Sequence, residues 1–163
     1  LLKKRSCNSK NPGRTKEINV FKICFDRKSN APFFIFDLPG FGYANISKET
    51  QKEWQKLIDA FLDMFAKKIL LIYIQDGRHP QSSSDQIFSD YIEGYNIQTL
   101  LVFNKIDKLN QRERSVLDKN KISICQNFLW VKQIHFVSNH TGEGIEQLKL
   151  ALLAEICGNP QTH

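Results

Sequence analysis

Hydrophobic and polar residues follow two rhythms along this chain, and the first rhythm predicts β-strands. Several short runs are almost entirely apolar, which is typical of strands covered on both faces in a parallel sheet. These runs are Phe33–Asp37, Ile69–Ile74, Thr99–Asn104 and Ile134–Ser138. The segment Ile18–Phe25 instead alternates apolar and polar residues, which predicts an edge or half-buried strand.

The second rhythm places apolar residues three and four positions apart and predicts α-helices between the strands. The expected ranges are 47–65 with Ser47 as N-cap, 84–93 ending at Gly94, 110–129 with Asn110 and Glu113 as a capping box, and 143–156. Alternating strands and helices predict an α/β fold, a doubly wound and mostly parallel sheet with helices on both faces. We expect one domain over residues 1–163.

Chemically active residues should lie just after each strand, because ligands of such sheets bind at the carboxyl ends of the strands. Asp37 and Gly40 form a D-x-x-G motif after the second expected strand. Asn104, Lys105 and Asp107 form N-K-x-D after a later strand. Each short motif is weak alone, but N-K-x-D directly after a buried strand is specific.

The N-K-x-D motif predicts recognition of a guanine base. Guanine presents N1–H and N2–H₂ as adjacent donors, and the ionised carboxylate of Asp107 can accept both. Asn104 can bridge the base and a neighbouring loop, and the stem of Lys105 can lie along the base plane. The alternative is that Asn104 and Asp107 only cap a turn.

The D-x-x-G motif predicts a contact with magnesium and a terminal phosphate. Asp37 can hold Mg²⁺ through water, because this ion keeps much of its hydration shell. Gly40 lets a backbone N–H approach a phosphate closely, so the loop can act as a switch. The hydroxyl of Thr15 is a second candidate ligand for the metal. An ordinary turn and a surface threonine are the alternatives.

The composition indicates which kind of partner and which cellular compartment to expect. The 163 residues carry 23 Lys plus Arg and 17 Asp plus Glu, a formal net charge of +6, which weakly favours a polyanionic partner. The four cysteines lie far apart, and Cys24 and Cys125 are expected in the core, so we expect a reduced, cytoplasmic protein. No apolar run approaches the roughly 18 residues of a membrane span.

The chain resembles the EngB/YihA/YsxC family of ribosome-biogenesis GTPases. The resemblance is carried by "NPGRTKEINVF", "DLPGFGYANISKETQKEWQKLI" and "DGRHPQSSSDQ" followed by "NKIDKL". It implies GTP and GDP binding, Mg²⁺, slow hydrolysis, and assembly of the large ribosomal subunit through ribosomal RNA. We expect a monomer that binds neither DNA nor a membrane.

The resemblance also implies residue roles. Thr15 corresponds to the switch I threonine. Ser138 and Asn139 correspond to the loop that supports the base, although the family has a small residue where Asn139 stands. Arg78 and His79 match the family's "RH" pair, which we expect to serve structure or partner contact.

The sequence departs from the family at the phosphate loop G-x-x-x-x-G-K-[ST], which has no counterpart here. Leu1 and Leu2 resemble the helix that follows this loop, so we expect a chain cut just after it. Phe41 stands where many GTPases carry a water-orienting glutamine, so hydrolysis should be slow, and no catalytic residue is assigned. The alternative is a pseudo-GTPase that binds nucleotide or RNA without hydrolysis.

Overall fold

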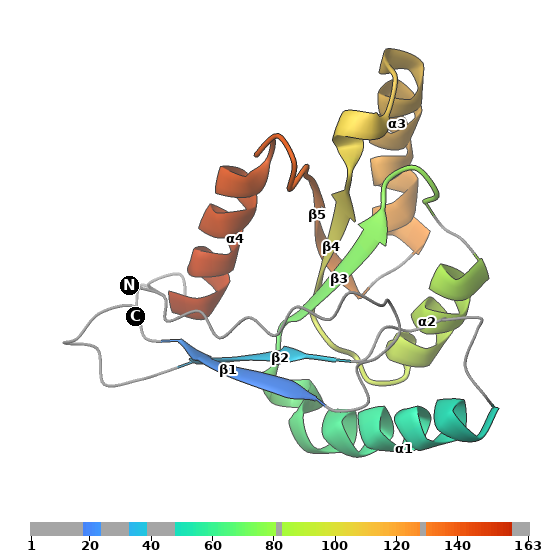
Figure 1. The fold of residues 1–163 in the computed structure, drawn as a ribbon, viewed down its shortest axis with the longest axis vertical. Helices are drawn as coiled ribbons and strands as arrows, with labels where there is room; N and C mark the ends of the chain where they lie inside the picture. Colours follow the sequence, from blue (N-terminus) through green and yellow to red (C-terminus); the bar gives the residue numbers. More distant parts are fainter. Residues whose placement is uncertain (1–17, 24–32, 39–47, 81–82, 128–129, 158–163) are drawn as a thin grey trace. The chain divides into compact units, whose positions relative to one another are not determined.

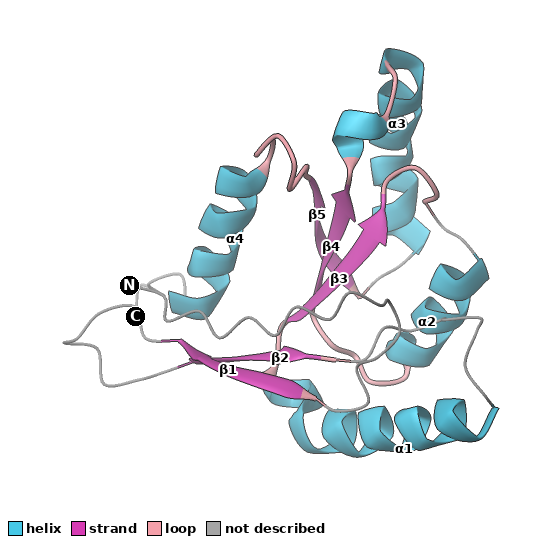
Figure 2. Cartoon of the chain, in the orientation of Figure 1, coloured by secondary structure: helices cyan, strands magenta, loops and turns pink. Residues whose placement is uncertain are grey.

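The computed structural model of the protein describes residues 18–23, 33–38, 48–80, 83–127 and 130–157. These residues belong to two compact units, Leu1–Phe61 and Leu62–His163. Figure 1 traces the chain through both, and Figure 2 separates its helices from its strands.

The first unit contains an antiparallel strand pair. β1 (Asn19–Ile23) pairs with β2 (Phe33–Asp37), with Asn19 opposite Asp37 and Ile23 opposite Phe33. Both strands were predicted. Coverage of Phe33–Asp37 on both faces is wrong, because Phe34 and Ile35 are 50% and 43% exposed. An apolar run shows that a segment can form a strand, but it does not specify the partner strand or the cover.

The helix α1 (Lys48–Phe65) begins in the first unit and ends in the second. Ile58, Phe61 and Leu62 of the predicted apolar face are buried, whereas Leu57, which was predicted on the same face, is 37% exposed. The ring of Phe61 packs against that of Phe36 in β2, with centroids 5.0 Å apart. A short 3-10 helix, η1 (Ala66–Lys68), follows. The expected N-cap Ser47 lies outside the described residues.

The second unit is built on a parallel sheet in the order β3-β4-β5, with β3 at Leu71–Asp76, β4 at Thr99–Asn104 and β5 at Val131–Phe136. The central strand β4 matches its predicted range, and Thr99 to Phe103 are all buried. β3 starts and ends two residues later than predicted, and β5 lies earlier. Ile72 and Ile74 of β3 are 37% and 62% exposed, so full cover holds for the central strand only.

Helices lie on both sides of this sheet. Figure 1 shows α4 (Ile145–Cys157) on one side, and α2 (Ser83–Glu93) and α3 (Gln111–Asn127) on the other. α2 packs through Phe88, whose ring stacks on Tyr73 of β3 at 4.1 Å. The Tyr73 hydroxyl donates a hydrogen bond to Asp85. Burial is the main cause that raises the pKa of Tyr73, and this hydrogen bond is the second.

The helix α3 begins with the predicted capping box. The backbone N–H of Asn110 donates to Glu113 Oε2 at 2.8 Å, and the N–H of Glu113 donates to Asn110 Oδ1 at 2.9 Å. These bonds satisfy N–H groups that have no partner inside the helix. Farther along α3, Ile124 is buried but Cys125 is exposed, so the prediction that Cys125 lies in the core is wrong, and Cys24 lies outside the described residues. Ile124 and Cys125 are adjacent in sequence, and a helix points neighbouring residues in different directions.

Candidate functional site

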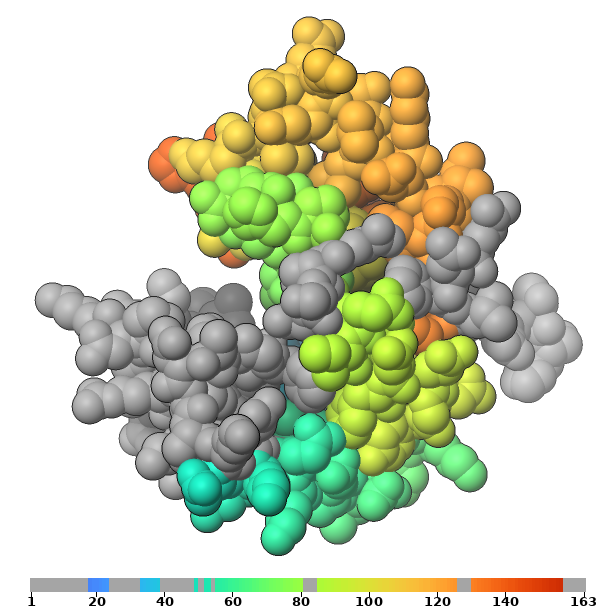
Figure 3. Space-filling view, turned by 90° about the vertical axis from the view of Figure 1, so that its right-hand side faces the viewer, coloured from blue at the N-terminus to red at the C-terminus, as the bar shows by residue number. Residues whose placement is uncertain are grey.

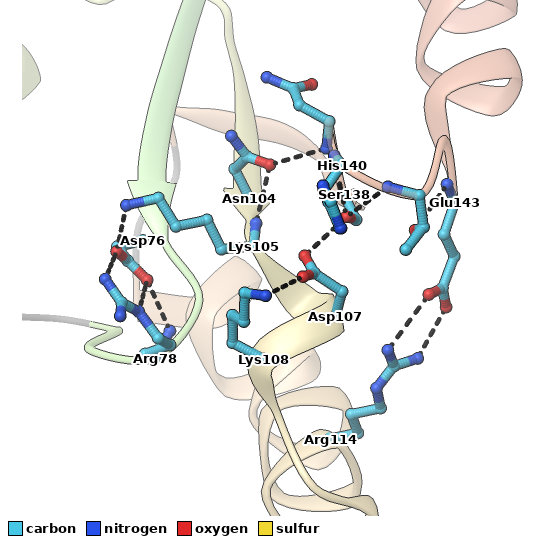
Figure 4. A network of polar contacts seen from close by, with 12 residues as sticks. Asp76, Arg78, Asn104, Lys105, Asp107, Lys108, Arg114, Ser138, His140 and Glu143 are labelled. Carbon is cyan, nitrogen blue, oxygen red and sulfur yellow. Dashed lines mark hydrogen bonds and ion pairs between the residues drawn. The ribbon is translucent and has the colours of Figure 1, made fainter.

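The carboxyl ends of the three parallel strands carry a network of polar side chains (Figure 4). The segments after β4 and β5 bring Asn104, Lys105, Asp107, Ser138 and Asn139 together through hydrogen bonds. These are the residues that the sequence predicted for a base-binding site.

Asn104 joins the segments that follow β4 and β5. Its Oδ1 accepts the backbone N–H of Lys105 at 2.7 Å and that of Asn139 at 3.2 Å. Lys105 has φ 64° and ψ 30°, a left-handed conformation that few residues other than glycine adopt. Asn104 therefore caps a turn, as the alternative interpretation required, but it also ties that turn to the loop after β5. Because both bonds use the carbonyl oxygen, the amide nitrogen is the end that can donate to a ligand.

Asp107 lies in the short helix η2 (Ile106–Lys108) and is held from both sides. The Ser138 hydroxyl donates to its Oδ1 at 2.6 Å, and Lys108 Nζ lies 3.1 Å from its Oδ2. The hydrogen bond from Ser138, followed by Lys108, lowers the pKa of Asp107. The carboxylate is therefore ionised and fixed in direction. Each oxygen has two lone pairs, so a carboxylate with one partner on each oxygen can still accept two adjacent N–H donors.

The loop after β5 is shaped around Ser138, which is fully buried. Its hydroxyl accepts the backbone N–H groups of His140 and Thr141 at 3.2 and 3.1 Å. Its own N–H donates to the Glu143 carbonyl at 2.9 Å. Arg114 of α3 donates two hydrogen bonds, of 2.7 and 3.2 Å, to the Glu143 carboxylate. The loop is thereby fastened to α3 as well as to Asp107.

Asp76, which sequence reasoning did not single out, ends β3 at the same edge. Arg78 donates to both of its oxygens, from Nε at 2.9 Å and from a terminal nitrogen at 2.6 Å. Lys105 Nζ lies 2.9 Å from Oδ2. The hydrogen bonds from Arg78 are the main cause that lowers the pKa of Asp76, and the contact with Lys105 is a smaller one. The available signal was its place: Asp76 follows an apolar strand, as Asn104 does.

The expected metal and phosphate residues fall mainly outside the described residues, which exclude Thr15, Gly40 and Phe41. Asp37 is described at the end of β2, where its carboxylate is exposed and its Oδ2 lies 3.5 Å from Asn19 Nδ2. An exposed carboxylate at a strand end suits Mg²⁺, which is held by one or two carboxylates together with water and phosphate oxygens. The described part of the chain contains no cluster of three or more His, Cys, Asp or Glu residues that could hold a metal alone.

In the described ranges, no helix is both long enough and apolar enough to cross a bilayer.

Comparison with known proteins identifies the family. A family model described as 50S ribosome-binding GTPase matches residues 1–105. The Probable GTP-binding protein EngB of Syntrophomonas wolfei is 33% identical over 154 residues, which cover 90% of this chain and 75% of that protein. The protein of the same name from Natranaerobius thermophilus is 36% identical over 143 residues, which cover 86% and 69%.

Solved structures agree on the fold. The crystal structure of a probable GTP-binding protein engB aligns with a TM-score of 0.66 and 24% identity, covering 94% of this chain and 87% of that one. Era in complex with MgGDPNP and nucleotides of 16S ribosomal RNA aligns with a TM-score of 0.67 and 18% identity, covering 90% and 46%. These likenesses confirm the predicted α/β fold of a G domain. The sequence matches, in turn, show that the chain belongs to the EngB family of GTP-binding proteins.

Proposed function

We propose that residues 1–163 form part of a single G domain that binds GTP and GDP and acts as a switch in assembly of the large ribosomal subunit. The observation that carries the proposal is the Asp107 carboxylate, ionised and aimed by Ser138 beside Asn104 and Lys105. This arrangement suits the two adjacent N–H donors of guanine. Adenine has an acceptor at the corresponding nitrogen, so the carboxylate would repel it.

Each residue has a role in this proposal. Asp107 accepts guanine N1–H and N2–H₂, Asn104 donates to the base edge, and the stem of Lys105 lies along the base. The backbone of Ser138 and Asn139 lines the base. Thr15 and Asp37 would hold Mg²⁺, which neutralises charge on the phosphates, and the Gly40 backbone N–H would contact the terminal phosphate.

Hydrolysis is slow in this proposal, because Phe41 cannot orient water. Family membership supports a GTPase and lends no support to the pseudo-GTPase alternative. The ribosomal target is suggested by the description of the matching family. We propose a cytoplasmic protein that acts as a monomer.

Nucleotide competition on the full-length protein tests the base assignment. Bound labelled GDP should be displaced by unlabelled GDP at far lower concentration than by ADP, because only guanine pairs with Asp107. Equal displacement by the two nucleotides would refute the proposal.

We propose that a basic face of the helix α1 makes the contact with ribosomal RNA. Lys48, Lys52 and Lys56 recur every four residues along α1, and Lys52 and Lys56 are exposed. Such a face binds RNA phosphates largely by counterion release, so affinity falls with salt. Pelleting with large-subunit particles should therefore be sensitive to salt. We also expect pelleting to be stronger with a GTP analogue than with GDP.

Charge reversal on this face tests whether the face itself, and not the overall surface charge of the protein, binds the particles. Replacing Lys48, Lys52 and Lys56 by Glu should abolish pelleting and leave GDP affinity nearly unchanged. A control protein with Lys67, Lys68 and Lys119 replaced by Glu has the same net charge and should still pellet. Pelleting that is insensitive both to salt and to the triple substitution in α1 would show that this face is only solvated surface.

A further inference from the structure

Two cations share the Asp76 carboxylate, and they come from different parts of the chain. Arg78 lies two residues later in the same turn, whereas Lys105 lies 29 residues away at the end of β4. Figure 4 shows the carboxylate between the two side chains. Asp76 therefore connects the turn after β3 to the N-K-x-D motif.

The orientation of the Asp76 carboxylate is fixed by Arg78. The Arg78 backbone N–H donates to Oδ1 at 3.1 Å, its Nε donates to the same oxygen at 2.9 Å, and a terminal nitrogen donates to Oδ2 at 2.6 Å. A planar fork of this kind sets both the position and the plane of a carboxylate. Oδ2 is thereby presented to Lys105 Nζ.

The backbone of the same turn is fastened to β4. The Gly77 N–H donates to the Asn104 carbonyl oxygen at 2.8 Å. A Cβ at position 77 would lie 3.0 Å from that oxygen, so the close approach favours glycine. The turn after β3 is therefore tied to the end of β4, and Asp76 lies beside Asn104, its partner in the sheet register.

Lys105 is held at both ends. Its backbone N–H donates to Asn104 Oδ1, which supports its left-handed conformation, and its Nζ is held by Asp76 Oδ2. The four-carbon stem lies between these two contacts. As an ion pair alone, the contact would contribute little to stability, because the Lys105 side chain is 53% exposed. Its consequence is instead the position of the stem.

We propose that Asp76 is a positioning residue that holds the Lys105 side chain in the conformation that binds the nucleotide base, with Arg78 orienting Asp76. The inference rests on the proposed function and adds to it a role for the turn after β3. A free lysine stem loses rotamer freedom when it packs on a ligand, and this loss weakens binding. Anchoring Nζ in the folded protein removes most of that loss from the binding step.

A double-mutant cycle on the full-length protein tests the inference. GDP binding is measured by calorimetry for the parent, Asp76→Asn, Lys105→Met and the double variant. Asp76→Asn keeps the shape but removes the charge, so GDP binding should weaken roughly three- to tenfold. In the Lys105→Met background the same substitution should change binding less than about twofold, because no Nζ remains to be positioned. Additive effects would overturn the inference.

Further variants control for folding and for charge. Arg78→Ala leaves the charge of Asp76 but frees its orientation, so it should show a smaller loss that again vanishes with Lys105→Met. This second cycle decides the matter if Asp76→Asn does not fold. Asp90→Asn, at an exposed carboxylate that accepts a bond from Gln86 in α2, should leave GDP binding unchanged.

A readout without nucleotide is also available. The Lys105 side-chain resonances of the nucleotide-free parent should show a restricted side chain, and those of Asp76→Asn a mobile one. Identical mobility in the two proteins would contradict the inference. A parent that does not prefer GDP over ADP would refute the proposed function itself, whereas a parent that prefers GDP but gives additive cycles would refute only the role of Asp76.

Discussion

The hydroxyl of Ser138 donates a 2.6 Å hydrogen bond to Oδ1 of Asp107, joining residues 31 positions apart. Ser138 is fully buried, and its oxygen also accepts the N–H groups of His140 and Thr141. The direction of the proposed base-reading carboxylate is therefore set by a group that is itself fixed within the loop after β5.

Removing this hydroxyl should weaken nucleotide binding. Ser138→Ala frees Asp107 Oδ1 and removes the acceptor for two backbone donors. A hydrogen bond to a charged group contributes about 1.5–3 kcal/mol, so we expect GDP binding to weaken at least about tenfold by calorimetry. Thr141→Ala removes a neighbouring hydroxyl that accepts the Glu143 N–H and should have little effect. Equal losses in the two variants would mean that Ser138 only stabilises the loop.

Two glycines in the same loop should respond differently to alanine. Gly142 and Gly144 both have positive φ, +83° and +74°, so each substitution carries a backbone strain of about 1–2 kcal/mol. A Cβ on Gly144 would also overlap the Phe136 carbonyl oxygen, whereas nothing lies within 4 Å at Gly142. In urea unfolding, Gly144→Ala should lose about 2 kcal/mol or more beyond Gly142→Ala. Equal losses would contradict the close packing of Gly144.

The capping box of α3 should contribute measurably to stability. Asn110→Ala and Glu113→Ala each leave a backbone N–H of the first turn without its side-chain acceptor, and each should cost about 1 kcal/mol in urea unfolding. The double variant should lose less than the sum, because the two bonds form one reciprocal unit. Asp118→Ala, at an exposed position of the same helix, is the control and should cost little. Full additivity would contradict reciprocal capping.

His135 should make stability depend on pH below neutrality. Burial, followed by the nearby positive charge of Lys121, lowers the pKa of His135 from its usual 6.5. The unfolded chain therefore takes up this proton at higher pH than the folded chain does. Stability should fall as the pH drops below about 6.5, and continue to fall until the folded imidazole is protonated.

Variants separate the two causes of this shift. His135→Gln should flatten the stability curve between about pH 7 and pH 5. Lys121→Gln should reduce the slope by removing the repulsion, whereas Lys119→Gln on the same helix should not. Unfolding curves at a series of pH values provide the measurement. An unchanged slope in His135→Gln would show that another group is responsible.

The sequence predicted best where local pattern and environment agree. Thr99–Asn104 is apolar on both faces and is the central, buried strand, so even its ends were correct. The Asn110–Glu113 capping box is a local signal and was confirmed at both of its bonds. The base-site residues follow strands whose carboxyl ends meet at one edge, so their proximity was predictable.

Long-range contacts and exposure were harder to predict. Nothing local to Asp76 indicates that its carboxylate meets Lys105, since the contact depends on β3 lying beside β4. The sequence named Ser138 as a loop residue, but the bond from its hydroxyl to Asp107 requires the loop geometry. The exposure of Phe34 and Ile35 depends on what covers β2, which an apolar run does not specify.

Asp107 is proposed to read the nucleotide base, so replacing it should change which base the protein prefers. Xanthine has an N1–H donor beside a C2 carbonyl acceptor, which the amide of Asn matches better than a carboxylate does. Dissociation constants for GDP and XDP should be measured for the full-length parent and for Asp107→Asn. We expect the parent to prefer GDP, and Asp107→Asn to lose at least about tenfold in GDP affinity and to prefer XDP. A variant that keeps the parent's preference for GDP would show that another group reads the base.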